Sequence, residues 1–423
     1  MSYVSHLVCT NCGKTYPAAP EALTCPVCGP EAGILDVVYD YEGIAKLDLR
    51  SRLARDKDPS IWRYSPLLPV TEGLPRPPLR VGGTPLYAAE RLGAQLGGPT
   101  GSRLGLRRLQ IKDDGLNPTG SLKDRASIIA VAKAGEAGAG VVACASTGNA
   151  ASSLAGNAAA VGLRSCIFVP GRAPQGKVAQ LRIYGATVIS VQGSYRDAFE
   201  LSQQAINRWG WYNRNAALNP YLVEGKKTVS LEIAEQSRWE VPDWVVFSVG
   251  DGCTIAGGWK GFFDLYRAGV TDRMPRLLGV QAEGANPISR AFHGGGPVQP
   301  TGEDTIADSI AVGVPRNPQK ALRAVRESGG EMVDVSDEDI REAMRLLGST
   351  TGVFGEPAGA AGLAGLKKLV GSGGIGPDER VVLVVTGNGL KDAANAIAAA
   401  GEPIRIGADL GRLEQALGGS GLV

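Results

Sequence analysis

The feature that most constrains this 423-residue chain is an alternation of short β-branched runs with helical stretches of about 10 to 15 residues. Helices are expected from residue 122, from residue 149, near residues 175–184 and from residue 195. Strands are expected at residues 109–114, 141–145, 165–170, 187–191 and 244–250, and the alternation continues through residues 277–284 and closes with residues 380–389. Such alternation is typical of βα units on parallel sheets. A second series of units begins at Trp244, so the sequence predicts two α/β lobes.

The length and charge of the chain indicate a protein of several domains that binds neither nucleic acid nor membrane. The chain exceeds the roughly 250 to 300 residues at which single cores stop growing, so two or more domains are expected. Lys plus Arg number 44 against 42 Asp plus Glu, and no block of like charges indicates nucleic acid as a partner. The longest apolar runs are shorter than a membrane helix, and the first residues lack a signal-peptide pattern. We therefore expect a cytoplasmic protein with no membrane partner.

Four of the seven cysteines stand near the amino terminus in the pattern C-x2-C-x12-C-x2-C. Two such knuckles can hold one tetrahedral Zn²⁺, and Gly13 and Gly29 supply the tight turns that they need. Four thiolates leave no open coordination position, so the expected role is structural. A disulfide-bonded or metal-free pair of knuckles is the alternative. The predicted structural zinc ligands are Cys9, Cys12, Cys25 and Cys28.

The loop after the first strand of the alternation, DDGLNPTGSLKDR, places a lysine in the first turn of a helix. Pro118 and Gly120 make the turn, and Ser121 or Thr119 is expected to cap the helix. The helix dipole and burial both lower the pKa of Lys123, which suits an amine that forms an imine. A surface lysine is the alternative. A Walker loop is excluded because Ser121 stands where its lysine should be.

The segment ASTGN follows the next strand, at the end of the strand where parallel α/β proteins collect their active sites. Its backbone amides at a helix start suit a carboxylate. Asn149 can donate a hydrogen bond to a phenolic oxygen, and a plain helix cap is the alternative for the whole segment.

Two further turns lie in the second series of units. The glycine-rich segment VGDGCT at residues 249–254 suits a phosphate monoester. A dinucleotide fingerprint would need a glycine where Ile255 stands, so that alternative is weak. Thr386 follows a buried strand in VVTGNGLKD, where its hydroxyl suits the pyridine nitrogen of a cofactor or caps the next helix.

In this order the four segments resemble the threonine synthase family of fold-type II enzymes, which use pyridoxal 5′-phosphate (PLP). LNPTGSLKDR is close to the family's NPTGSFKDR, with Leu122 in place of phenylalanine. Further family segments are matched by ASTGN, by residues 219–228 (NPY…EGKKT), by residues 354–362 (FGEPAGAAG) and by TGNGLKD. The resemblance spans residues 82–392, and some members also carry a cysteine-rich ribbon at the amino terminus.

The resemblance implies a two-lobed α/β fold of the tryptophan synthase beta-like type, with parallel sheets flanked by helices and a small zinc ribbon. A homodimer is ordinary for this fold and is expected here. The expected domains are residues 1–40 (ribbon), 41–110 (connecting segment and start of the body), 111–235 (mainly the smaller lobe, with Lys123) and 236–423 (larger lobe, with the phosphate loop).

The resemblance also implies a role for each site residue. Lys123 is expected to hold PLP as a Schiff base, and Asn149 to contact the 3′-oxygen of the ring. Thr386 is expected to face the pyridine nitrogen; a hydroxyl cannot hold that nitrogen protonated, which favours elimination or replacement at the β or γ carbon. Glu356 is expected to support the cofactor pocket or to cap a helix. The cofactor phosphate is assigned to Gly250, Asp251, Gly252, Cys253 and Thr254, and the substrate carboxylate to Ser146, Thr147 and Gly148.

The implied reaction is that of threonine synthase, in which O-phosphohomoserine and water give threonine and phosphate by γ-elimination and β-addition. Two departures concern the substrate. Leu222 stands where the family's NPxRLEG segment has an arginine expected to bind the substrate phosphate, and Asp251 brings a negative charge to the phosphate loop. Lys226 or Lys227 is a candidate replacement, with a solvated surface pair as the alternative.

The missing arginine leaves other functions open. One is β-replacement or β-elimination on O-phosphoserine or a hydroxy amino acid, as in a cysteate synthase or a threonine/serine dehydratase. Another is a non-catalytic adaptor that only binds metabolites, although that class is expected to lack a Schiff-base lysine such as Lys123.

Overall fold

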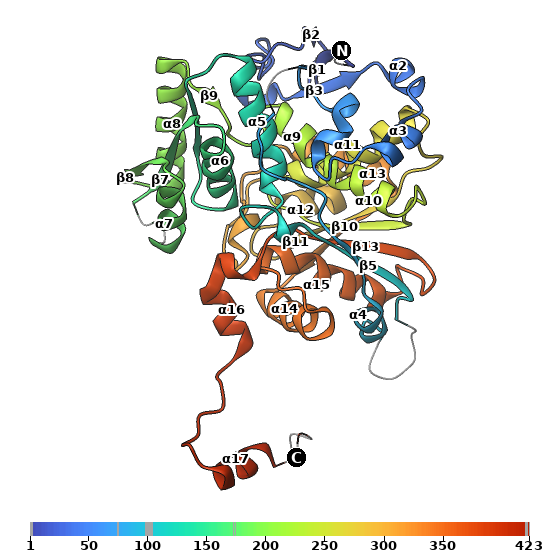
Figure 1. The fold of residues 1–423 in the computed structure, drawn as a ribbon, viewed down its shortest axis with the longest axis vertical. Coiled ribbons are helices and arrows are strands. Elements are labelled where there is room, and N and C mark those ends of the chain that lie inside the picture. Colours follow the sequence, from blue (N-terminus) through green and yellow to red (C-terminus); the bar gives the residue numbers. More distant parts are fainter. Residues whose placement is uncertain are drawn as a thin grey trace.

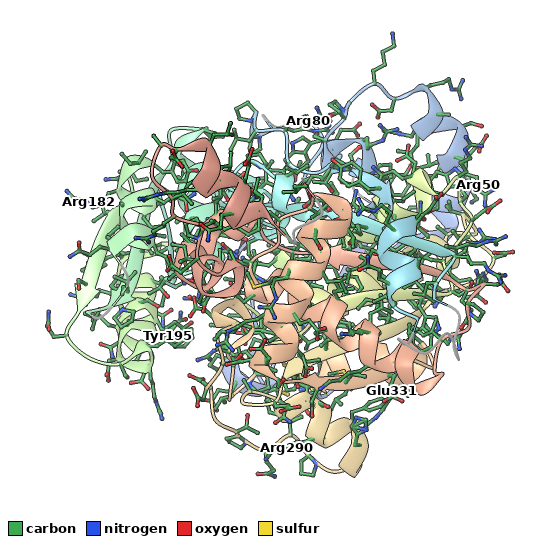
Figure 2. All side chains as sticks on the ribbon, turned by 90° about the horizontal axis from the view of Figure 1, so that it is seen from below. Arg50, Arg80, Arg182, Tyr195, Arg290 and Glu331 are labelled. Atoms are coloured by element: carbon green, nitrogen blue, oxygen red, sulfur yellow. The ribbon has the colours of Figure 1, made fainter. Side chains whose placement is uncertain are left out.

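The structure, a computed structural model, describes residues 3–73, 76–97, 105–171, 173, 175–418 and 422. Figure 1 shows two β-sheets with helices packed on their faces and a third, small sheet at the amino-terminal end. Charged side chains such as Arg182 and Arg290 point outward at the periphery in Figure 2. None of the described helices combines the length and the apolar composition that a bilayer span requires.

The larger sheet has six strands in the order β12–β11–β10–β13–β5–β4. Its neighbours run parallel except for β4 and β5, which are antiparallel. Valine and leucine fill the central strands, because helices cover both faces of the sheet. The strands are β4 (Leu86–Ala88), β5 (Arg108–Asp113), β10 (Trp244–Ser248), β11 (Arg276–Ala282), β12 (Glu331–Val335) and β13 (Arg380–Val385).

The helices of the larger lobe pack closely on its sheet. A Cβ atom at Gly365 of α15 would lie 2.3 Å from a methyl carbon of Val280 in β11, so only glycine permits this approach. The helices are α4 (Glu90–Gln95), α9 (Tyr221–Lys226), α10 (Thr228–Gln236), α11 (Cys253–Arg267), α12 (Pro287–Gly294), α13 (Pro318–Glu327), α14 (Asp337–Thr351), α15 (Pro357–Ser372), α16 (Ala393–Ala400) and α17 (Leu410–Leu417). Short 3-10 turns are η2 (Asp114–Leu116), η3 (Asp308–Ile310) and η4 (Gly389–Asp392).

The smaller sheet has four parallel strands in the order β8–β7–β6–β9. Its strands are β6 (Val141–Ala145), β7 (Arg164–Pro170), β8 (Thr187–Val191) and β9 (Tyr212–Asn213). Its helices are α5 (Lys123–Glu136), α6 (Asn149–Ala159), α7 (Gln175–Ile183) and α8 (Tyr195–Trp209). Helix α5 also packs against α9 of the larger lobe. Two parallel sheets flanked by helices confirm the predicted two-lobed fold.

The small amino-terminal sheet is antiparallel, in the order β2–β1–β3, and it is docked on the larger lobe. Leu7 shares one buried core with Phe262 of α11. Asp36 forms ion pairs with Lys320 and Arg323 of α13. The elements here are β1 (Val4–Cys9), β2 (Thr15–Tyr16), α1 (Gly29–Ala32) and β3 (Leu35–Tyr39), followed by α2 (Tyr41–Ala45), α3 (Leu49–Arg55) and the 3-10 turn η1 (Ile61–Leu67).

The boundaries predicted at residues 40, 110 and 235 stay predictions. The hydrogen bonds do show how the chain divides between the sheets. Strand β5, which leads to Lys123, pairs with β13 in the larger sheet. The chain therefore contributes a strand to the larger sheet before it builds the smaller one.

The predicted cap of α5 by Ser121 or Thr119 is wrong. Leu122 is the residue before the helix, and no side chain caps it. The carboxylate of Asp124, in the first turn, instead accepts hydrogen bonds from the backbone N of Thr119 at 2.7 Å and from its hydroxyl at 2.8 Å. Ser121 pairs through its backbone with Gly387, and its buried Oγ has no hydrogen-bond partner among the described residues.

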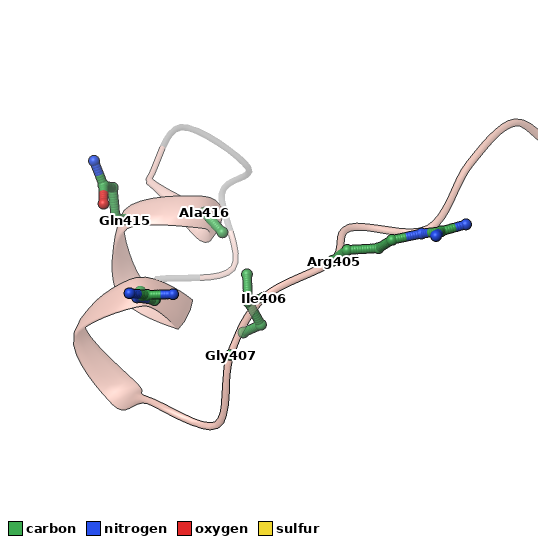
Figure 3. Close-up of a pocket in the computed structure, with 6 residues that line it drawn as sticks. Arg405, Ile406, Gly407, Gln415 and Ala416 are labelled. Carbon is green, nitrogen blue, oxygen red and sulfur yellow. The ribbon is translucent and has the colours of Figure 1, made fainter.

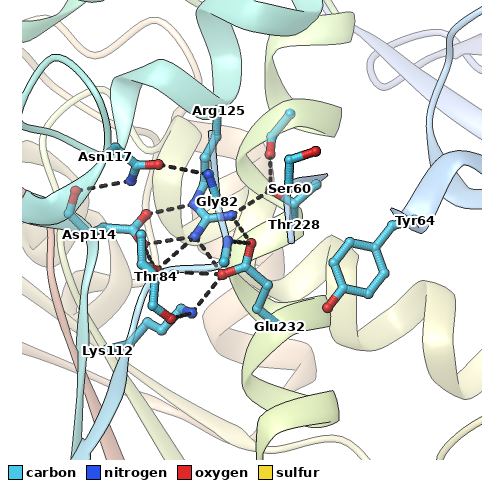
Figure 4. A network of polar contacts seen from close by, with 12 residues as sticks. Ser60, Tyr64, Gly82, Thr84, Lys112, Asp114, Asn117, Arg125, Thr228 and Glu232 are labelled. Carbon is cyan, nitrogen blue, oxygen red and sulfur yellow. Dashed lines mark hydrogen bonds and ion pairs between the residues drawn. The ribbon is translucent and has the colours of Figure 1, made fainter. Parts of the chain in front are cut away.

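A buried ionic network fixes the start of α5 to the larger lobe (Figure 4). Arg125 donates to both carboxylate oxygens of Asp114, at 2.7 and 2.8 Å, and to both of Glu232, also at 2.7 and 2.8 Å. Lys112 donates to Glu232 at 2.6 Å. Burial alone would raise the pKa of Glu232, but Arg125 and Lys112 hold it well below its ordinary value.

Replacing Arg125 by methionine should destabilise the protein by about 3 to 5 kcal/mol, because it leaves Asp114 and Glu232 buried without their cation. Urea denaturation followed by circular dichroism measures this change. The matched control is Arg196→Met, which breaks an exposed ion pair with Glu200 and should leave the midpoint unchanged. Equal midpoints for the two variants would show that the network contributes nothing to stability.

Candidate active site

Four loops from the carboxyl ends of strands form the candidate site. Those after β5, β10 and β13 come from the larger sheet, and the loop after β6 comes from the smaller one. Ser121 in the first loop bridges to Gly387 in the loop after β13. Asn149, after β6, donates from Nδ2 to Glu356 Oε1 at 2.7 Å across the two lobes. The structure therefore brings together the segments that the sequence singles out.

Lys123 is the first residue of α5, and its side chain is partly buried. Burial and the nearby charges of Lys226 and Arg214 lower the pKa of its ammonium group from 10.5 to about 8. Among the described residues its Nζ makes no hydrogen bond and no ion pair. A lysine in this state loses its proton far more readily than one at the surface, as imine formation requires.

The loop after β10 turns at Gly252, whose φ of +85° favours glycine. A Cβ atom there would lie 2.7 Å from the backbone O of Asn317, so the loop packs tightly against the segment that leads into α13. Asp251 Oδ1 accepts a hydrogen bond from the backbone N of Arg316 at 3.2 Å. The carboxylate is thus occupied by an amide, which reduces its repulsion of an anion bound at the loop.

The remaining predicted residues lie at the same edge. Thr386 directly follows β13, and its backbone O accepts from the N of Leu122 at 2.8 Å, which fixes it beside the start of α5. The segment of Ser146, Thr147 and Gly148 is partly exposed and leads into α6. A Cβ atom at Gly148 would meet nothing within 4 Å, so open space adjoins this turn.

Glu356 lies immediately before α15 and is 5% exposed. Burial raises the pKa of its carboxyl from 4.5 to about 7, although Lys123, Lys391 and the hydrogen bond from Asn149 oppose the rise. Its Oε1 stands 2.4 Å from the position that a Cβ atom at Gly387 would take, so glycine is required there.

Replacing Glu356 by glutamine should change how stability depends on pH in the cofactor-free protein. Because the folded pKa of about 7 exceeds the unfolded value of 4.5, the folded state binds the extra proton between these values. The free energy of unfolding therefore falls as pH rises through this window, by at most about 3 kcal/mol. Glutamine keeps the hydrogen bond from Asn149 but cannot ionise, so the fall should disappear.

Urea midpoints between pH 4 and pH 8 measure this dependence. The control is Glu42→Gln, an exposed carboxyl on α2, which should keep the wild-type pH profile. A Glu356→Gln variant with the same profile as the wild type would contradict the raised pKa.

Sequence reasoning missed one basic residue of the site. Arg214, just after β9, is 2% exposed, and its Nη2 has no hydrogen-bond partner among the described residues. Its positive charge acts on Lys123 and Lys226. Its position in the run YNRN carries no motif, so only the chain's folding brings it to the site.

The alternative of a solvated surface pair at Lys226 and Lys227 is wrong. Both side chains are buried, because α9 is held between α5 and α11. Lys227 forms ion pairs with Glu224 and Asp264, whereas Lys226 makes neither an ion pair nor a hydrogen bond among the described residues. Leu222 belongs to the apolar core of the smaller lobe, so it offers nothing to an anion.

The four amino-terminal cysteines come together in the small sheet. Their Sγ atoms all lie within 4.8 Å of one another, with Cys9 and Cys28 at 3.9 Å and Cys12 and Cys25 at 3.7 Å. These spacings match the roughly 3.8 Å edge of a tetrahedron built from Zn–S bonds of about 2.3 Å. The cluster is consistent with zinc. Cys144 and Cys166, outside this cluster, are buried in strands of the smaller sheet.

The hollow drawn in Figure 3 lies between α17 and the segment before it. None of the predicted site residues lines it; Arg405, Ile406 and Gln415 do. Figure 1 shows α17 projecting away from both sheets. The candidate active site is therefore defined by the four loops and not by this hollow.

The residues of the site fit PLP. Lys123 supplies an amine with a lowered pKa, and a glycine turn followed by the start of α11, a helix of 15 residues, suits a phosphate group. Arg214 and Lys226 are buried cations that make no ion pair among the described residues, so an anionic group is what the site lacks.

Comparisons with known proteins agree with this chemistry. The family model described as pyridoxal-phosphate dependent enzyme matches residues 78–387. The threonine synthase of Methanocaldococcus jannaschii is 41% identical over 412 residues, which cover 97% of this chain and 98% of that protein. The threonine synthase of Methanosarcina acetivorans is 41% identical over 419 residues, 98% of this chain and 99% of that one.

Solved structures share the fold. Threonine deaminase isoform 2 from Solanum lycopersicum superposes with a TM-score of 0.63 at 23% identity, covering 75% of this chain and 88% of that one. Diaminopropionate ammonia lyase from Escherichia coli has a TM-score of 0.63 at 20% identity, with 93% and 96% covered. The chain belongs to the pyridoxal-phosphate dependent enzymes and, within them, to the threonine synthase family.

Proposed function

We propose that this enzyme converts O-phosphohomoserine and water to threonine and phosphate. The observation that carries the proposal is 41% identity to two proteins named threonine synthase, over 97% and 98% of this chain. The excess of buried positive charge around Lys123 suits a substrate that carries a phosphate group.

Lys123 is the residue proposed to attach the cofactor and, as a free amine, to move protons at Cα and Cβ of the substrate. A pKa of about 8 lets one group both accept and donate a proton near neutral pH. PLP supplies the electron sink for negative charge on the substrate carbons. Proton transfer by a positioned residue contributes roughly 10²- to 10⁴-fold to the rate.

Other residues are proposed to hold the cofactor. Asn149 donates to Glu356 at 2.7 Å and to Ser309 Oγ at 3.3 Å, and the second, longer bond is the one that a ring oxygen would replace. Thr386 would face the ring nitrogen. The turn of Gly250, Asp251, Gly252, Cys253 and Thr254 would hold the cofactor phosphate.

The substrate carboxylate is proposed to bind at the turn of Ser146, Thr147 and Gly148. The following helix, α6, has 11 residues, and its amino-terminal end favours an anion. The hydroxyl of Ser146 already accepts from the N of Gly148 at 3.2 Å, which holds the turn in shape without the ligand.

A second candidate function is β-elimination or β-replacement on O-phosphoserine or a hydroxy amino acid. The burial of Leu222 favours it, because this position supplies no cation for a γ-phosphate. The buried cations Arg214 and Lys226 argue against serine or threonine as the substrate, because the side chains of these amino acids carry no negative charge to neutralise the two cations.

The test offers O-phosphohomoserine, O-phosphoserine, serine and threonine separately to the PLP-loaded protein, and measures phosphate, ammonia and amino-acid products. Threonine and equimolar phosphate from O-phosphohomoserine, with little turnover of the others, is the expected result. Ammonia or phosphate mainly from the other three substrates would favour the second candidate. Absence of phosphate release from O-phosphohomoserine would overturn the proposal.

We also infer a homodimer and a cytoplasmic location. Light scattering should give a mass twice the 43.9 kDa of one chain. A mass of one chain at micromolar concentration would contradict the dimer.

A further inference from the structure

Two buried cations beside Lys123, Arg214 and Lys226, have no counter-ion among the described residues. Arg214 is 2% exposed, and of its guanidinium nitrogens Nε donates to Ser127 Oγ at 3.1 Å while Nη2 has no hydrogen-bond partner in the described part of the chain. Lys226 is 4% exposed and makes no hydrogen bond or ion pair with any residue that the structure describes. Burial lowers the pKa of both groups.

The fold fixes the backbone at both positions. A Cβ atom at Gly225 would lie 2.0 Å from the backbone O of Arg125 in α5, and one at Gly257 would lie 2.9 Å from Cβ of Lys226. These two glycines let α9 approach α5 and α11 closely, where the charge of Lys226 acts on Lys123 and is itself acted on by Cys253 and Asp251 of the loop after β10. Arg214 is fixed by its backbone N, which donates to the O of Ala143 at 2.9 Å.

An isolated buried charge destabilises the folded protein, because it loses its hydration and gains no ion pair or hydrogen bond in return. Two acidic groups, the Cys253 thiol and the Asp251 carboxylate, oppose the lowering of the pKa of Lys226, and the carboxylate already accepts a hydrogen bond from the N of Arg316. Lys227, the neighbouring lysine, is in contrast paired with Glu224 and Asp264. A site that keeps two unpaired cations is suited to an anionic ligand.

We propose that Arg214 and Lys226 bind the phosphate group of the substrate, and so replace the arginine that this chain lacks at Leu222. This rests on the proposed function, in which the substrate is a phosphate monoester. The cofactor phosphate is the other possible ligand, but the glycine turn and the start of α11 already offer it backbone amides. Arginine and lysine provide the charge-assisted hydrogen bonds that a dianion needs.

The first experiment measures binding of inorganic phosphate to the PLP-loaded protein by isothermal titration calorimetry. Lys226→Met and Arg214→Met should each weaken phosphate binding about 10- to 100-fold, the effect of losing one hydrogen bond to a charged group. Lys226→Arg should restore most of the affinity. Lys46→Met, which removes an exposed lysine, is the matched control and should bind phosphate as the wild type does.

Two readouts separate binding from a structural role. Lys226→Met should raise KM for O-phosphohomoserine by the same 10- to 100-fold while kcat changes little. It should also raise the Tm of the cofactor-free protein, because methionine removes an unpaired buried charge. A lower Tm would mean that Lys226 stabilises the fold, and would overturn the proposal.

The same variants distinguish the two sources of phosphate. A weaker affinity for PLP, measured by equilibrium dialysis, with unchanged binding of inorganic phosphate to the loaded protein would assign both side chains to the cofactor and contradict the proposal. No phosphate binding to the wild type would contradict it also. Phosphate binding needs no turnover, so loss in the variants would support this site even if O-phosphohomoserine proved not to be the substrate.

Discussion

Lys123→Ala should lower turnover by at least roughly 10³-fold, because one change removes both the cofactor attachment and the proton-transfer group. The visible absorbance of the PLP-loaded protein should disappear with it. The side chain is only partly buried and makes no hydrogen bond to the described residues, so the variant should keep the wild-type Tm. Steady-state kinetics and an absorbance spectrum on the same preparation measure both effects.

Lys123→Arg is the informative control. Arginine keeps the positive charge beside Arg214 and Lys226, but its guanidinium does not lose a proton and forms no imine. It should therefore be as inactive as Lys123→Ala. Activity within about tenfold of the wild type in either variant would mean that another group performs the proton transfer.

Removal of zinc from the four-cysteine cluster should unfold the small amino-terminal sheet. Binding of structural zinc contributes on the order of 10 kcal/mol to the folding of small four-ligand domains. This sheet has only three strands, one of them two residues long, and cannot build a core alone. In the Cys25→Ser variant, amide hydrogen exchange in β1 and β3 should become fast.

The effect should also reach the cofactor loop. Ile34 packs against Ala217 and Cys253, and its backbone O accepts two hydrogen bonds from Thr10, between the first two cysteines. Losing the metal should therefore weaken PLP binding as well. Added Zn²⁺ should restore exchange protection in chelator-treated wild type, whereas Mg²⁺, which prefers oxygen ligands, should not. Unchanged exchange after complete metal removal would contradict a structural role.

Much of the fold could be predicted from the sequence because local patterns determine it. The β-branched runs mark strands β5, β6, β7, β8, β10, β11 and β13. Which strands become neighbours could not be predicted. Strand β5 lies beside β13, more than 260 residues later, because pairing depends on tertiary packing that periodicity does not report.

The residues of the site also divide into those that local sequence predicts and those that only the folded chain brings together. The four loops carry glycine, proline and polar residues in short runs, so local sequence reveals them. Arg214 stands in a run with no such pattern. Lys226 stands in a recognised segment, but the sequence does not separate it from Lys227; only the structure shows the close packing of α9, permitted by Gly225 and Gly257, that buries it without an ion pair among the described residues. From the sequence, the negative charge of Asp251 in the phosphate loop is expected to repel an anion. Only the structure shows that its carboxylate accepts a hydrogen bond from the N of Arg316.

The measurement that tests the central claim most directly is borohydride reduction of the PLP-loaded protein, followed by proteolysis and mass spectrometry. Reduction makes the link between cofactor and lysine permanent, so the modified peptide identifies the residue. The result expected is one cofactor adduct per chain, on the peptide that contains Lys123. An adduct on Lys226, on Lys391 or on any other lysine would contradict the assignment of this site.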